Sequence, residues 1–152
     1  MQTGYTWFLH DNILRNTSHG ICREEYDLCV IDGPKNWTID GAAFFFADKL
    51  LKPRGWIIFD DYDWTYGADP GRSSTDGITH RLLSQAELET PQIKDVFELL
   101  VMQHSNYSNF ALLGSSWAVA QKIRSSKKFY TIVYKDVIAK GIRKVQRLIR
   151  GG

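Results

Sequence analysis

The sequence is poor in several features that mark specialised classes of protein. It has only two cysteines, Cys22 and Cys29, and their spacing is not that of a metal-binding motif, so we expect reduced thiols. No apolar run approaches the roughly 18 residues needed to cross a membrane. The first residues lack the basic start and apolar block of a signal peptide. These absences predict a cytoplasmic protein without a membrane span.

The sequence does contain enough apolar material for one domain with a core. Of its 152 residues, 43% are hydrophobic and 13% are aromatic, which argues against a disordered chain. The net charge of +2 is unevenly distributed, because nine of the 19 Lys and Arg but only one of the 17 Asp and Glu follow residue 123. We therefore divide the chain into a folded part, residues 1–126, and a basic segment, residues 127–152.

The basic segment is expected to form one amphipathic helix over residues 129–150. Its apolar residues recur at helical spacing, with Lys and Arg on the other face. The apolar face could dock on the sheet of the same chain. It could also dock on a sister subunit, and the protein would then be a homo-oligomer. Alternatively, the basic face could contact nucleic acid or an anionic membrane surface. No aromatic interleaving on the polar face supports base stacking, so nucleic acid is not the expected partner.

The clearest pattern is a strand, a helix and a second strand between Tyr26 and Tyr62. Residues 27–31 form an apolar run that Gly33 and Pro34 end, as expected for a buried strand. A helix capped by Thr38 or Asp40 follows and should stop at residues 52–55. Residues 56–59 form the second strand. A right-handed crossover of this kind makes the two strands parallel neighbours.

The remaining elements are less sharply marked. Residues 5–9 could be a strand, residues 62–74 a loop, and residues from 74–76 to about 88 a helix. Residues 94–103 and 117–121 are expected to be strands, and their connection favours an antiparallel pair. The sequence thus predicts an α/β fold with parallel strands and a terminal antiparallel pair.

Carboxylates follow both strands of the central unit. Because the two strands are parallel, Asp32, Asp60 and Asp61 should emerge at one edge of the sheet, where open α/β folds bind ligands. The same residues could instead cap turns, with Asp32 beginning an Asx-turn.

Aromatic residues flank the same edge. Trp37, Tyr62, Trp64 and Tyr66 could wall a substrate pocket and exclude water from it. They could equally cover the end of the sheet.

Three short segments resemble motifs of a known family. They are residues 31–33 (Ile-Asp-Gly), 51–55 (Leu-Lys-Pro-Arg-Gly) and 59–62 (Phe-Asp-Asp-Tyr). They resemble the second half of Rossmann-like, S-adenosylmethionine-dependent O-methyltransferases, and the metal-dependent small-molecule branch in particular. The resemblance covers roughly residues 26–122. It implies a half-sheet in the order fourth, fifth, seventh and sixth strand, with the last strand antiparallel, flanked by helices.

The resemblance also implies a chemistry. In that branch the acids at the positions of Asp32, Asp60 and Asp61 bind a divalent cation, usually magnesium. The residue at the position of Lys35 acts as general base, and its pKa would be lowered by the cation. The activity implied is magnesium-assisted transfer of a methyl group to a hydroxyl of a small molecule, such as a sugar or a phenol. A plain surface lysine in a turn is the alternative for Lys35.

The sequence departs from the family in its first part. The Gly-rich loop that binds the methyl donor and the acid that ends the second strand are both missing, and Asp11 is the residue that could match the acid near the adenine. We therefore expect a truncated copy, a fragment, or a half completed by another chain, whose first strand lacks a neighbour. A non-catalytic interaction module that uses the basic segment for oligomerisation or anion binding is the alternative function.

Overall fold

The structure is a computed structural model that describes residues 4–69, 71, 75, 81–114 and 116–127. Its elements are α1 (Tyr5–Arg15), β1 (Thr17–Ser18), β2 (Ile21–Cys22), β3 (Tyr26–Ile31), α2 (Trp37–Leu50), β4 (Leu51–Phe59), the 3-10 turn η1 (Tyr66–Ala68), α3 (Gln85–Glu89), α4 (Gln92–Asp95), the π-helical η2 (Val96–Val101), β5 (Tyr107–Leu113) and β6 (Trp117–Lys122). No helix in these ranges is long and apolar enough to cross a membrane. The helix expected over residues 129–150 lies outside the described residues.

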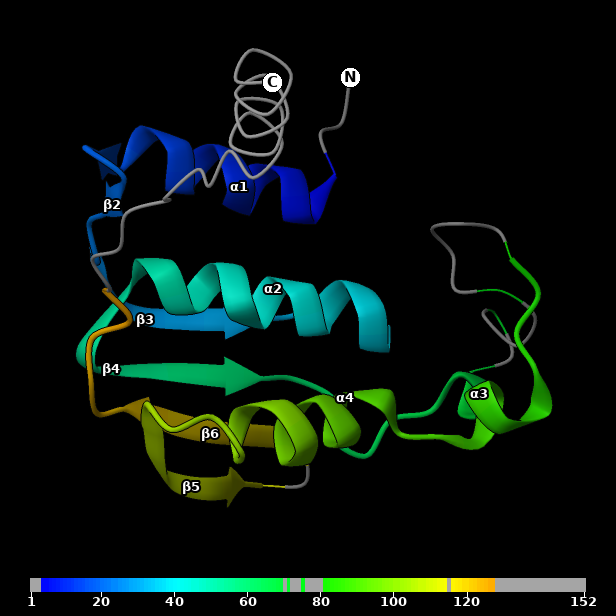
Figure 1. Cartoon of the computed structure of the whole chain (residues 1–152). Coiled ribbons are helices and arrows are strands. Elements are labelled where there is room, and N and C mark those ends of the chain that lie inside the picture. The colour runs from blue at the N-terminus through cyan, green and yellow to red at the C-terminus, as the bar shows by residue number, and fades with distance from the viewer. Residues whose placement is uncertain (1–3, 70, 72–74, 76–80, 115, 128–152) are drawn as a thin grey trace, which may run out of the picture.

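A four-stranded mixed sheet, in the order β3-β4-β6-β5, forms the centre of the molecule (Figure 1). Strands β3 and β4 are parallel, with Val30 opposite Ile58, as the crossover predicts. Strand β6 runs antiparallel to both β4 and β5. The fold is therefore α/β with helices flanking a mixed sheet, as expected. Among the described strands, β3 has no partner on its outer side.

Helix α2 connects the two parallel strands and covers one face of the sheet. Asn36 caps it, because the side-chain oxygen of Asn36 accepts hydrogen bonds from the N–H groups of Thr38 and Ile39. The prediction that Thr38 or Asp40 caps this helix is therefore wrong, because the cap lies two to four residues earlier in the sequence. The helix also ends before the predicted stop, at Leu50, because residues 51–55 already belong to β4.

The core lies between the sheet and the helices on that face. Its largest members are aromatic rings from four elements, with Phe44 of α2 in contact with Phe59 and Tyr107 and with Phe97 against Phe59. The buried apolar cluster comprises Ile31, Ala43, Phe44, Ala47, Leu51, Ile57, Phe59, Tyr62, Ile93, Val96, Phe97, Val101, Tyr107, Ala118 and Ala120.

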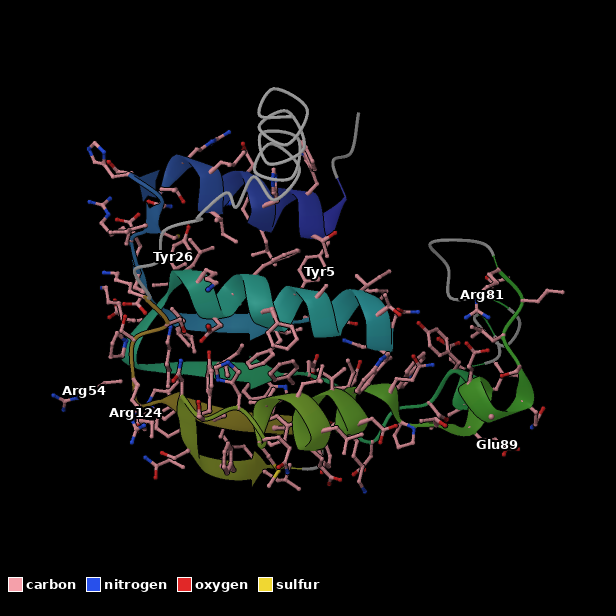
Figure 2. All side chains as sticks on the ribbon, viewed as in Figure 1. Tyr5, Tyr26, Arg54, Arg81, Glu89 and Arg124 are labelled. Atoms are coloured by element: carbon pink, nitrogen blue, oxygen red, sulfur yellow. The ribbon has the colours of Figure 1, made fainter. Side chains whose placement is uncertain are left out.

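The strand predicted at residues 5–9 is wrong, because these residues begin the helix α1. Tyr5 and Leu9, four residues apart, lie on one side of α1 and pack against the core. Figure 2 shows Tyr5 extending from α1 toward α2. Burial of this one stripe on α2 outweighs the strand preference of the local aromatic and β-branched residues.

The strand predicted at residues 94–103 is also wrong, because α4 and η2 occupy this stretch. The antiparallel partner of β6 on this side is instead β5, which lies in the segment expected to be a connection. Among the described residues of the helix predicted up to residue 88, the helix α3 begins at Gln85, where Ser84 and Glu87 form a capping box. Residues 76–80 of that prediction lie outside the described residues.

Candidate functional site

The two parallel strands end side by side. Ile31 pairs with Phe59 at the carboxyl ends of β3 and β4, and the N–H of Asp60 donates to the carbonyl oxygen of Ile31 at 3.1 Å. Asp32 follows directly after Ile31, and Asp61 follows Asp60. The register of the sheet therefore delivers the expected acids to a common edge.

Lys35 joins two of these acids. Its ammonium nitrogen lies 2.6 Å from Oδ1 of Asp32 and 3.2 Å from Oδ2 of Asp61. Since both distances end on one nitrogen, the two carboxylate oxygens are at most 5.8 Å apart (2.6 plus 3.2 Å). The side chain of Lys35 is only 6% exposed. A buried cation thus stands between two converging carboxylates.

Both ends of this ion pair have a strained backbone. Lys35 has φ of 66° and Asp61 has φ of 61°, in the left-handed region that residues other than glycine seldom adopt. Strain of this kind persists only where the surrounding structure enforces it, and it is concentrated at functional sites. The turns after β3 and β4 are therefore shaped so that the two side chains meet.

The electrostatics of the cluster keep Lys35 charged. Burial by itself would lower the pKa of Lys35, but its hydrogen bonds to Asp32 and Asp61 outweigh this and raise the pKa above its ordinary value. The lowering of the Lys35 pKa that is expected beside a bound cation stays a prediction. Lys35 is a proton donor here, and it can act as a base only once its contacts with the carboxylates are weakened.

Three groups hold the Lys35 turn, and of these only Tyr66 was expected at this edge. The buried hydroxyl of Tyr66 donates to the carbonyl oxygen of Pro34 at 2.7 Å. The N–H of Asn36 donates to Oδ2 of Asp40 at 2.8 Å. The first residues of a helix commonly carry such caps, so the spacing of Asn36 and Asp40 was a usable signal, whereas the sequence suggested Tyr66 only as a wall of the pocket.

Gly33 is required by the position of Asp40. A Cβ atom at residue 33 would lie 1.9 Å from Oδ1 of Asp40. Asp40 is fully buried, and this oxygen has no hydrogen-bond partner. Burial raises the pKa of Asp40 to about 6, partly offset by the hydrogen bond from Asn36. The carboxyl group of Asp40 therefore lies packed beneath the turn that presents Lys35.

The carboxylate pair, but not the full triad, has the chemistry of a cation site. Asp32 and Asp61 already surround one positive charge, and hard carboxylate oxygens suit magnesium. Oδ1 of Asp60 accepts the N–H of Asp61 at 2.9 Å. Among the described residues, no three His, Cys, Asp or Glu side chains are grouped so that they could hold a metal ion. A magnesium ion would therefore take Asp32 and Asp61 as ligands in place of the Lys35 ammonium.

The predicted substrate residues have different environments. Tyr62 is buried, donates its hydroxyl to Oε1 of Glu98 at 2.6 Å and packs edge-on against Phe97, so it covers the end of the sheet. Trp37, the first residue of α2, is 38% exposed. Trp64 is partly exposed and lies edge-on to Tyr66, with ring centroids 4.9 Å apart. Trp37 and Trp64 remain the candidates for contact with a substrate.

Asp11 lies apart from this cluster. It is on α1, partly exposed, and paired with Arg15 at 2.6 Å in the same helix. The strand exit on which its assignment to the methyl donor depended does not exist, so the assignment has lost that support.

Comparison of the chain with protein-family models and with curated proteins found no match to either.

Proposed function

We propose that this chain is the carboxyl-terminal half of an S-adenosylmethionine-dependent, Rossmann-like methyltransferase domain that methylates a hydroxyl of a small molecule with help from magnesium. Support comes from the strand order β3-β4-β6-β5 with β6 antiparallel, the order that the resemblance implies. The observation that carries the proposal is the buried Lys35, held between Asp32 and Asp61 at the ends of two parallel strands.

The chain's own residues have separate roles in this proposal. Asp32 and Asp61 fix the position of a cation and of a substrate oxygen near it. Lys35 holds or accepts the hydroxyl proton at its Nζ atom. Tyr66 and Asp40 keep the turn that carries Lys35 in place. When bound, magnesium would make the substrate hydroxyl more acidic, and S-adenosylmethionine would supply the methyl group.

Titration with Mg²⁺, followed by calorimetry, and with Mn²⁺, followed by electron paramagnetic resonance, tests the cation site. We expect the double variant Asp32→Asn plus Asp61→Asn to lose binding. The matched control is Asp27→Asn, which changes an exposed carboxylate at the other end of β3. Unchanged binding in the double variant would rule out the site.

A second variant separates a cation site from a simple ion pair. Lys35→Met removes the internal cation that competes for the two carboxylates, so we expect Mn²⁺ affinity to rise by about tenfold or more. If Asp32 and Asp61 serve only to pair with Lys35, this variant should lose stability without any gain in cation affinity.

A further inference from the structure

One face of the sheet carries exposed apolar side chains. Pairing places Leu28 beside Trp56 and Val30 beside Ile58 on the parallel strands. The same face continues across β6 and β5, where Trp56 pairs with Gln121, Ile58 with Val119, and Trp117 with Leu113. We call Leu28, Val30, Trp56, Ile58, Val119, Trp117 and Leu113 the open face. Five of them are between 39% and 55% exposed, whereas Ile58 is half-buried and Val119 is buried.

The opposite face of β3, β4 and β6 is covered. The alternating residues Ile31, Ile57, Phe59, Ala118 and Ala120 are buried beneath the helices. Figure 1 shows α2 and α4 on the same side of the sheet. Parallel strands are normally covered on both faces, because their side chains are apolar on both. The described residues therefore cover only one of two apolar faces.

The size and charge of the open face indicate what it binds. None of its seven residues is charged, although the part of the chain before residue 124 is rich in acids. Its side chains expose on the order of 500 Å², near the upper end for a patch on a monomer and more than half of the ~800 Å² that each partner gives to a standard interface. A neutral apolar face of this kind suits another neutral apolar face rather than a nucleic acid.

We propose that a second copy of this chain occupies the open face, with the two sheets packed face to face about a two-fold axis. Such a contact is self-complementary, since each copy offers the same uncharged rows of side chains and no like charges meet. Two sheets packed in this way lie about 10 Å apart, so that side chains from each fill the space between them. Trp56 and Trp117 would be the large anchors of the interface.

Sedimentation of the full chain over a range of concentrations tests this proposal. We expect a species of twice the chain mass of 17.5 kDa. Leu28→Glu should weaken self-association by about 100-fold or more. The reason is that two-fold symmetry places one added carboxylate from each copy in the apolar interface. Leu99→Glu is the matched control, since Leu99 is similarly exposed but lies on η2, away from the open face. It should leave the dimer intact.

Three results would overturn the proposal. The first is a wild-type chain that stays monomeric up to about 100 μM, well above the Kd expected for a standard interface. The second is a Leu28→Glu variant that dimerises as tightly as the wild type. The third is an unchanged dimer in Trp117→Glu, a variant at the other end of the open face. Circular dichroism of each variant checks that the monomer remains folded, which the exposure of these positions favours.

Discussion

Replacing Asp40 by asparagine should make the stability of this protein less dependent on pH. Asp40 is fully buried in the first turn of α2, where one carboxylate oxygen accepts the N–H of Asn36 and the other has no partner. Asparagine retains an oxygen for the first contact and cannot ionise. The substitution therefore removes the charge of Asp40 while it preserves the hydrogen bond that supports the Lys35 turn.

The size of the effect follows from the pKa of Asp40. Burial raises this pKa from 3.8 to about 6, which corresponds to about 3 kcal/mol between the two protonation states. Because the pKa is higher in the folded state, folding is favoured while the carboxyl is protonated. That contribution is complete below pH 3.8 and is lost as the pH rises through about 6.

Urea unfolding at a series of pH values, followed by tryptophan fluorescence, measures this contribution. The free energy of unfolding of Asp40→Asn, relative to wild type, should rise by up to about 3 kcal/mol between pH 4 and pH 8. Asp27→Asn on the exposed start of β3 is the control. A difference between Asp40→Asn and wild type that stays constant over this range would refute the argument that burial governs the titration of Asp40.

Two further substitutions probe contacts that organise the fold. Tyr66→Phe leaves the carbonyl oxygen of Pro34 without its donor, so urea unfolding should show a loss of about 1–3 kcal/mol. Lys122→Met removes a fully buried ammonium that donates to the carbonyl oxygens of Asp48 and Leu51 and to Glu24. Asp48 would then lose this counter-ion, and Glu24 would keep its pair with Lys127 at 3.7 Å, so unfolding should become easier by about 3–5 kcal/mol. A loss below about 1 kcal/mol in thermal or urea unfolding would contradict that role for Lys122.

The central crossover could be predicted because its signals are local and agree with one another. The apolar run before Asp32 ends at Gly33 and Pro34, and the next apolar run ends at two acids, so the parallel pairing followed from topology alone. The convergence of Asp32 and Asp61 follows from that pairing. The ammonium between them could not be predicted, because it depends on the left-handed backbone of Lys35 and on the distant Tyr66.

The errors have two different causes. In residues 94–103 a helical signal was present, since Ile93, Val96, Phe97 and Leu100 recur at intervals of three and four, but the valines and leucines were interpreted as a strand. In residues 5–9 no comparable signal was present, because the helix depends on burying Tyr5 and Leu9 against other elements. Tertiary contacts decided this segment, and its local composition did not.

The buried Lys122 has a consequence for synthesis of the protein on the ribosome. It ties the segment before β3 and the end of α2 to the last described strand, which also separates β4 from β5 in the sheet. In a nascent chain that has not yet reached residue 122, β4 therefore lacks its partner strand β6. Glu24 and Asp48 also lack the counter-ion that Lys122 supplies. Folding of this domain should thus be delayed until nearly all of these residues have emerged from the exit tunnel, and β4 would need protection from aggregation until then.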